Sequence, residues 1–569
     1  MKRLLPIVII LAAGMVIWMH YGKSRNFATR SNAAQSAVTS SKPSASDPVA
    51  ERHREAANRK RTIVYNTDGC DMVYYPKRAK VEVGDFCAQR IRHMLGTKIS
   101  TMSYCPLASG FAHFTSFRVG YPLTATVNPE SGSYNATTAF WEQLHTDALE
   151  MALEFAKTNG VERFLSIRMN DSHDGSHLDP NPSSKNYLKP HPFFTKFKTD
   201  HPECLMGRQG GKDGKPVTCY WQWTCVNYME PLVQQEVRKF IRQFCENYDM
   251  EGIELDFCRH LMYVKDVVYG GTANDAQRKV LTDMMSDLRE IVKEYEAKKG
   301  HAILLTARVP DSIGYCKDIG FDLPAWLKND SVDALIGGCY FNLEDPSTMA
   351  KLCHSYGKKF YTSVDESRIR HKEAIPGRDS AENYNARFAA SIDAGADAVY
   401  LFNREGGWLH NLAQTDPHDT VGLNKIYFAT ERGPGGYGPD HYLVGGGKKW
   451  RRLPNLVPAD SEEHERIVST LADYSVKIRL AEDFAAAEKK GLKAKVELLV
   501  RSRAEKPEQM KLKFNGKDLG SPATVEKGLS IYPVETSQVK RGINDFVFSA
   551  VEKSYTLRDL AVRVTYSKN

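Results

Sequence analysis

The sequence predicts an α/β protein: a (β/α)8 (TIM) barrel followed by a C-terminal β-sandwich. Between residues 61 and 430, short runs rich in β-branched and aromatic residues alternate with helical runs, which is the pattern of a parallel sheet with crossover helices. Eight such strands fit this stretch, the number that a closed barrel requires. Beyond residue 475, apolar and polar residues alternate between turn signals, which indicates an antiparallel sandwich.

The barrel elements follow in order along the chain. The expected strands are residues 62–66, 99–104, 163–169, 252–257, 302–309, 334–340, 359–364 and 398–402. The expected helices are residues 84–95, 137–158, 228–248, 274–299, 323–327, 347–356 and 381–394. Several of the helical runs end at a glycine, as helices commonly do. A doubly wound open sheet is the alternative, but the Gly-rich phosphate-binding turn that such sheets usually carry is absent.

The same pattern divides the chain into domains. The sandwich is expected at residues 475–569, with strands at 495–502, 510–514, 529–532, 545–551 and 560–566. We expect a signal peptide or signal-anchor at 1–20, a disordered linker at 21–60, the barrel at 61–445 and a connector at 446–474.

The N-terminus predicts export. Lys2 and Arg3 precede an apolar run, residues 4–18, as in a secretory signal. The run is shorter than the roughly 20 residues of a membrane span, although an uncleaved anchor remains open as an alternative. We therefore expect a periplasmic or extracellular protein, in contact with a membrane only through such an anchor.

Charge distribution argues against a nucleic-acid partner. The net charge is +8, but residues 1–60 hold ten Lys and Arg against three Asp and Glu. The remaining body is nearly neutral and lacks the basic surface that nucleic acids require.

Cysteine spacing gives no metal site. The 11 cysteines are spread along the chain without the paired spacing of a zinc site. Cys204, Cys219 and Cys225 lie in one irregular insertion, where an exported protein can form a disulfide. Cys258 and Cys339 fall in predicted strands and are interpreted as small buried residues rather than nucleophiles.

The fourth predicted strand carries two carboxylates on one face. Side chains alternate along a strand, so Glu254 and Asp256 point the same way. Two carboxylates on an apolar strand are costly to bury unless they are paired or functional. Asp256 lies at the C-terminal rim, where barrel enzymes hold their active sites, whereas Glu254 lies deeper and can instead be a layer residue paired with Arg308.

Other predicted strands end in polar and aromatic residues. Glycoside cleavage needs one carboxyl group as acid and another as nucleophile or base. Asp256 is the expected nucleophile or base, Glu254 its support, and Glu366 or Asp365 the acid. The expected substrate-binding residues are Asp68, Arg168, Asn170, His173, Arg259, His260, Arg308, Tyr340, Asn403, Glu405 and Trp408. The arginines among them suit carboxylate or sulfate groups on a sugar.

Three segments resemble a known group of proteins. Glu251-Gly-Ile-Glu-Leu-Asp-Phe257, Arg308-Val-Pro310 and Gly395-Ala-Asp-Ala-Val-Tyr-Leu-Phe-Asn403 are similar to barrel strands of bacterial "family 10-like" glycosyl hydrolases. The resemblance covers residues 61–445 and implies a (β/α)8 barrel with carbohydrate-directed activity. The fourth strand is also similar to the chitinase pattern D-G-x-D-x-D-x-E, but Cys258 stands at the position of the catalytic glutamate. A chitinase-type acid therefore does not carry over.

The sequence thus predicts a glycoside hydrolase acting on a polysaccharide or oligosaccharide, neutral or anionic, without a metal or cofactor. A non-catalytic carbohydrate-binding scaffold on the same fold is the alternative, since fold does not fix function. A metal-dependent esterase or deacetylase that uses Asp171 and His173 is the third reading.

Overall fold

The structure is a computed structural model. It describes residues 48–568 except 68–74, 77–81, 83, 85, 88–90, 109–111, 114–117, 120, 123–132, 135–142, 176–193, 208–221, 366–368, 370, 403, 405, 433–437 and 459–464. The predicted signal segment lies outside the described residues. No helix within the described ranges is both long and apolar enough to span a membrane.

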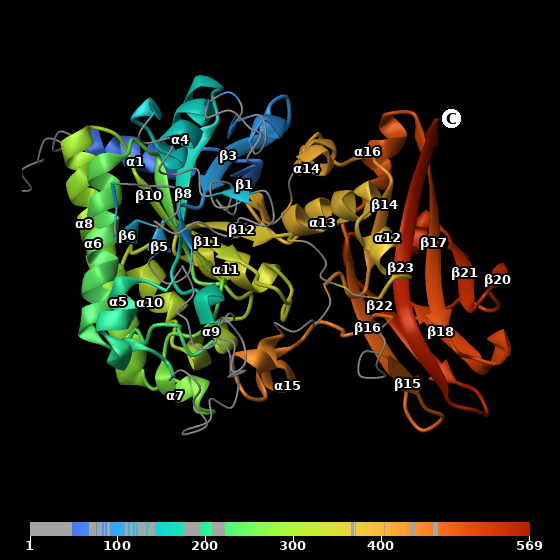
Figure 1. The fold of residues 1–569 in the computed structure, drawn as a ribbon. Helices are drawn as coiled ribbons and strands as arrows, with labels where there is room; N and C mark the ends of the chain where they lie inside the picture. Colours follow the sequence, from blue (N-terminus) through green and yellow to red (C-terminus); the bar gives the residue numbers. More distant parts are fainter. Residues whose placement is uncertain are drawn as a thin grey trace, which may run out of the picture. The chain divides into compact units, whose positions relative to one another are not determined.

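Eight parallel strands close into a barrel (Figure 1). They are β1 (Ile63–Thr67), β3 (Ile99–Tyr104), β8 (Glu162–Arg168), β9 (Gly252–Asp256), β10 (Leu304–Val309), β11 (Ala334–Gly337), β12 (Lys359–Ser363) and β13 (Ala398–Phe402). Each strand pairs in parallel with the next, and β13 pairs with β1 to close the ring. The barrel and all eight of its strands are therefore confirmed, with ends that shift by up to three residues.

Helices lie between successive strands, as the alternation of patterns predicts. The longer ones are α4 (Ala148–Thr158), α6 (Pro231–Asn247), α8 (Asp275–Lys299), α9 (Ile313–Ile319), α10 (Leu323–Lys328), α11 (Ser347–Ser355), α13 (Ala381–Asp393) and α14 (Gly406–Leu412). Shorter ones are α5 (Lys196–Asp200), α7 (Lys265–Val268), α12 (Ile375–Arg378), α15 (Gly446–Trp450) and α16 (Phe484–Lys489). Asn274 and Gln277 form a reciprocal capping box at the start of α8, and Gly300 ends it in the left-handed region at φ 72°.

Two expected helices lie partly outside the described residues. Within the helix expected at 137–158, residues 143–144 are helical, the helix is interrupted at 145–147, and α4 begins at Ala148, where the Asp147 carboxylate accepts the Glu150 N–H at 2.9 Å. Within the helix expected at 84–95, Gly84, Phe86 and Cys87 are helical and Arg92–Met94 form a 3-10 turn.

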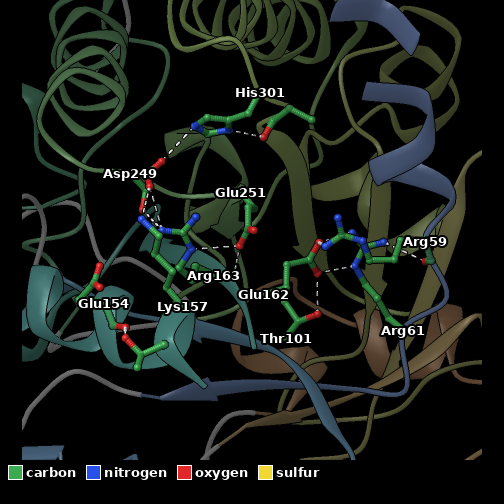
Figure 2. A network of polar contacts seen from close by, with 12 residues as sticks. Arg59, Arg61, Thr101, Glu154, Lys157, Glu162, Arg163, Asp249, Glu251 and His301 are labelled. Atoms are coloured by element: carbon green, nitrogen blue, oxygen red, sulfur yellow. Dashed lines mark hydrogen bonds and ion pairs between the residues drawn. The ribbon is translucent and has the colours of Figure 1, made fainter. Parts of the chain in front are cut away.

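Ion pairs fasten the N-terminal ends of the strands (Figure 2). Arg61 donates to both oxygens of Glu162, at 2.7 and 2.6 Å, and the Thr101 hydroxyl donates to the same carboxylate at 2.7 Å. Beside them, Arg163 donates to Glu251 at 3.1 Å and to Asp249 at 3.0 Å. This end of a barrel carries stability rather than catalysis, so the network is interpreted as structural.

Residues 48–58 are helical, although the sequence places them in a disordered linker. They form α1 (Pro48–Asn58), whose His53 ring lies between two buried carboxylates. Nδ1 is 2.5 Å from Glu296 and Nε2 is 2.8 Å from Asp333. These contacts with residues far along the chain accompany the helix. The composition of residues 48–58 contains no sign of them, which is why the sequence predicted a linker there.

Two antiparallel sheets form the C-terminal sandwich. One has the order β14–β23–β17–β21–β20, with β15 paired to β23, and the other the order β16–β22–β18–β19. The strands are β14 (Lys425–Phe428), β15 (Arg466–Val468), β16 (Tyr474–Leu480), β17 (Leu492–Ser502), β18 (Met510–Phe514), β19 (Lys517–Asp518), β20 (Thr524–Glu526), β21 (Leu529–Val534), β22 (Gly542–Ala550) and β23 (Tyr555–Lys568). Strand β14 belongs to the sandwich, although the segment that contains it was expected to belong to the barrel.

One buried and two partly buried ion pairs join the sandwich to the barrel. Arg378, at the end of α12, donates to both oxygens of Asp559 at 3.0 and 2.9 Å. Arg479 on β16 donates to Asp345 at 2.9 and 3.0 Å and to Asp393 at 2.8 Å. These contacts attach the sandwich through oriented, charge-assisted hydrogen bonds.

The cysteine expectations have mixed outcomes. Cys258 and Cys339 are buried, as predicted, and burial raises the pKa of the Cys258 thiol well above its usual range. Cys204 and Cys225 are both free thiols, so they form no disulfide with each other. Cys219 lies outside the described residues.

Candidate active site

Strand register places three charged residues side by side at the carboxyl ends of three strands. Asp256 on β9 is level with Arg168 on β8 and with Arg308 on β10. One layer deeper, Glu254 is level with Ser166 and Thr306. The alternation of side chains along β9 therefore separates the two carboxylates into a rim position and an interior position.

Glu254 is fully engaged by the barrel interior. Its carboxylate accepts hydrogen bonds from Asn66 at 3.0 Å, Ser103 at 2.6 Å, Ser166 at 2.9 Å and Tyr400 at 2.7 Å. Burial and, after it, the charge of Asp256 raise the pKa of Glu254, while hydrogen-bond donors oppose the rise. Four donors leave this carboxylate little capacity for a substrate, so it serves as a layer residue beneath Asp256.

Arg308 joins two carboxylates from different strands. Its Nη2 lies 2.5 Å from the Oδ2 of Asp365, just after β12, and its Nη1 lies 3.5 Å from the Oδ1 of Asp256. Because both nitrogens belong to one guanidinium group, the two carboxylate oxygens are less than about 10 Å apart, so their spacing does not exceed that of glycosidase carboxyl pairs. The partner of Arg308 at hydrogen-bonding distance is thus Asp365 rather than the Glu254 suggested by the sequence.

Asp256 and Asp365 have different surroundings. Burial raises the pKa of Asp256, although Arg308 and the Cys258 N–H, which donates at 2.9 Å, act against the rise. Asp365 accepts hydrogen bonds from Arg308 and Ser363, and Arg432 Nη1 lies 3.7 Å away. Two guanidinium groups and a hydroxyl therefore fix the position of this carboxylate.

Arg432 is a site residue that the sequence did not reveal. It follows β14 and donates to the carbonyl oxygens of Cys339 and Ser363, at the ends of two barrel strands. Gly338 makes room for this approach, since a Cβ there would lie 2.9 Å from Ser363, and its φ of 131° favours glycine. No sequence motif marks Arg432, because only folding brings it to the barrel.

A second chain of contacts runs from β8 to β11. Asp171 accepts from Arg168 at 2.9 Å and from the Nδ1 of His173 at 2.5 Å. Arg259 donates to His173 Nε2 at 3.0 Å and to the Tyr340 hydroxyl at 2.5 Å. These bonds assign the ring proton of His173 to Nδ1. The His173 side chain is 40% exposed, so this chain reaches solvent.

Asn170 and His260 serve the protein's own loops. The Asn170 amide donates to the Val226 and Met262 carbonyls, and its oxygen accepts the Val226 N–H. The buried His260 ring accepts the Ser172 N–H at 3.2 Å, and burial keeps the pKa of this ring well below its usual range. Both side chains shape the wall of the site.

Several expected site residues are not placed by the structure. Asp68, Glu366, Asn403 and Glu405 lie outside the described residues, as does the side chain of Trp408. Their expected roles in binding and acid catalysis stay predictions.

One group of side chains has the donor atoms of a metal site. Asp171, His173 and His260 each offer a ligand atom, and these atoms lie within 4.8 Å of one another. However, Arg168 is 2.9 Å from Asp171, and Arg259 Nε is 4.0 Å from the same carboxylate. A dication there would meet two positive charges at short range, so these residues fit a metal poorly.

Comparisons with known proteins find partial likenesses among solved structures. No family model and no curated sequence matches the chain. A cycloisomaltooligosaccharide glucanotransferase from Paenibacillus sp. is 8% identical, with TM-score 0.32, and the match covers 89% of this chain and 57% of that one. The GH36 alpha-galactosidase AgaB from Geobacillus stearothermophilus is 11% identical, with TM-score 0.33, covering 88% and 58%. The chain thus spans less than two thirds of either protein.

A third structure matches over nearly its whole length. The PgaB (BpsB) glycoside hydrolase domain from Bordetella bronchiseptica is 12% identical, with TM-score 0.38, covering 62% of this chain and 98% of that one. These structural neighbours are proteins that act on glycosides or are named as glycoside hydrolases. The closed barrel itself defines the present chain as a (β/α)8 protein.

Proposed function

We propose that this protein is a glycoside hydrolase whose reaction is carried by Asp256 and Asp365. The observation that supports this most directly is the arrangement of these two carboxylates around Arg308, at the ends of the fourth and seventh barrel strands. Their separation, less than about 10 Å, suits carboxyl groups placed on either side of a glycosidic bond.

The surroundings of each carboxylate suggest its role. The raised pKa of Asp256 suits a general acid that protonates the leaving glycosidic oxygen. The contacts of Asp365 with Arg308, Ser363 and Arg432 hold its carboxylate in a fixed position, which suits a group that attacks the anomeric carbon or activates water. This assignment exchanges the two roles expected from the sequence, where the acid was sought near residue 365.

The remaining residues of the site suit a polar or anionic sugar. Arg259 and His173 lie where the site reaches solvent, and guanidinium groups bind carboxylate and sulfate oxygens. We also propose that the substrate is a polymer of such sugars and that the protein is exported. The basic and apolar N-terminal pattern supports export.

Leaving-group dependence tests the assignment. The full chain is assayed on paired phenyl and 2,4-dinitrophenyl glycosides of several sugars, because a dinitrophenolate leaves without a proton. Asp256→Asn should slow phenyl glycosides by about 10²–10⁴-fold and spare the dinitrophenyl ones. Asp365→Asn should abolish turnover of both, whereas Asp322→Asn, which alters only a helix cap, should change neither. Wild-type rates for Asp256→Asn on phenyl glycosides would refute the assignment.

A non-catalytic carbohydrate-binding scaffold is the second candidate. The observation that favours it is burial: Asp256 and Asp365 are each 1% exposed and Arg308 is 0% exposed, as in a structural ion network. A wild-type protein that binds oligosaccharides but releases no reducing ends from any of them would support this candidate.

A further inference from the structure

A hollow lies between the barrel and the sandwich, beside the carboxyl ends of β11 and β12. The empty space inside it, which includes space open to solvent, is about 970 Å³. Residues after β11 and along β12 form one wall, and the segments around β14 and β16 form the other. Sites for ligands occur preferentially at such junctions between domains.

The walls of this hollow carry more positive than negative charge. Five cationic side chains line it: Arg387, Arg432, Arg451, Lys477 and Arg479. Three carboxylates also face it: Glu344, Asp345 and Glu431. Two of the three are matched within the protein, because Arg479 bonds Asp345 at 2.9 Å and Arg387 Nε lies 3.1 Å from Glu431. Outside these walls, Arg432 Nη1 lies 3.7 Å from Asp365 and Lys477 Nζ lies 3.8 Å from Asp545, so Arg451 is the lining cation for which the described residues provide no ion pair.

Several polar groups in these walls are under-satisfied. The Nε atoms of Arg432 and Arg451 and the Nη1 of Arg387 are buried, and no described residue accepts a hydrogen bond from them. Burial lowers the pKa of Arg432 and of Arg451, which is the electrostatic cost of a cation without enough nearby negative charge. An anion in the hollow would reduce that cost.

The walls also offer groups that suit a sugar ring. Phe428 supplies partly exposed aromatic surface, whereas the nearby Phe341 and Tyr427 rings are each only 1% exposed, and Asn342 supplies an amide. Aromatic faces and edges pack against sugar rings, and guanidinium groups bind carboxylate or sulfate oxygens. A neutral sugar would leave the excess charge uncompensated, whereas an anionic one would neutralise it.

We propose that this hollow is a second binding site, beside the Asp256–Asp365 pair but not formed by it, for a saccharide that bears a carboxylate or sulfate group. The site does not depend on catalysis at Asp256 and Asp365. It does adjoin Asp365, because Arg387 donates to the Asp365 carbonyl at 2.7 Å and Arg432 lies 3.7 Å from its carboxylate.

Calorimetric titration of the full chain with glucuronate tests the site, with glucose as the neutral probe and inorganic sulfate as the probe for the oxyanion alone. Glucuronate should bind saturably and glucose should not. Arg451→Gln should weaken glucuronate binding by roughly tenfold or more, because a charge-assisted contact is lost. Arg451→Lys should retain part of it, and Arg238→Gln, an exposed arginine on α6, should change nothing.

Lys477→Gln guards against a folding artefact, since the Lys477 side chain is 68% exposed and its loss should not disturb packing. It should also weaken glucuronate binding. The proposal is overturned if both Arg451→Gln and Lys477→Gln bind glucuronate as tightly as the wild type. If Arg259→Gln abolishes glucuronate binding while Arg451→Gln and Lys477→Gln do not, the ligand binds at the barrel mouth. If glucose binds as tightly as glucuronate, charge has no role in recognition at the hollow.

Discussion

The Arg308 guanidinium lies 2.5 Å from the carboxylate of Asp365, and both side chains are buried. The same guanidinium stacks over the Phe402 ring, 4.4 Å from its centroid, and lies 3.5 Å from Asp256. One side chain thus holds the carboxyl ends of the fifth and seventh strands in a fixed relation. The geometry of the proposed carboxyl pair depends on it.

Removal of the Arg308 charge should destabilise the fold and abolish activity. Arg308→Gln leaves two buried carboxylates without their shared cation, which costs about 3–5 kcal/mol. The free energy of unfolding, measured in urea, checks this expectation. Arg242→Gln, which removes an exposed ion pair with Glu294, is the control and should cost no more than about 1 kcal/mol. A loss of similar size in both variants would contradict the structural role of Arg308.

Glu254→Gln should affect stability more than chemistry. The NH2 group of the glutamine would face the hydroxyl and amide donors that now point at the Glu254 carboxylate. These contacts between donors should lower the free energy of unfolding by about 1–3 kcal/mol. Below its melting temperature the variant should keep the leaving-group dependence of the wild type. A kinetic pattern like that of Asp256→Asn would instead make Glu254 part of the proton transfer.

The contact between α1 and the barrel should weaken at alkaline pH. Burial alone would lower the pKa of His53, but hydrogen bonds to Asp333 and Glu296 and the charge of Asp333 raise it from 6.5 to about 9. The stabilisation is therefore fully present below pH 6.5 and is lost as pH rises through about 9. His53→Gln should lower the melting temperature at pH 6 and flatten its dependence between pH 6.5 and 9. Identical pH profiles for variant and wild type would exclude this linkage.

Metal chelation should leave activity unchanged. Arg168 and Arg259 lie 2.9 and 4.0 Å from the Asp171 carboxylate and would repel a dication bound to it, so Asp171, His173 and His260 should have no high affinity for Zn²⁺. Activity before and after dialysis against a chelator, with metal analysis of the protein, checks this. Loss of activity that Zn²⁺ restores would favour the metal-dependent esterase or deacetylase instead.

Local sequence patterns predicted the barrel because its strands are short runs rich in β-branched and aromatic residues, separated by helical runs. The ends of strands were less accurate: the strand expected at 334–340 ends at Gly337, where the positive φ of Gly338 turns the chain. Helix α1 was missed because its order depends on the distant residues Glu296 and Asp333. Strand β14 was missed because its partner, β23, lies more than 100 residues further along the chain.

The candidate site likewise has some features that local sequence patterns predicted and others that they did not. Alternation along β9 was enough to place Glu254 and Asp256 on one face and to put Asp256 at the rim. Whether Arg308 pairs with Glu254 or with Asp365 was decided only by the closed barrel, which brings the fifth and seventh strands within reach of one guanidinium. The same closure supplied Arg432 from beyond the last barrel strand.

The sequence by itself therefore determined the order of strands and helices, the sandwich that follows, and the face on which the carboxylates lie. These properties follow from periods of two and 3.6 residues, which are local. The tertiary structure alone decided which charges meet, the environment that raises the pKa of Asp256, and the cationic hollow beside the sandwich. Such properties arise from distances between residues far apart in the chain, and no local pattern encodes them.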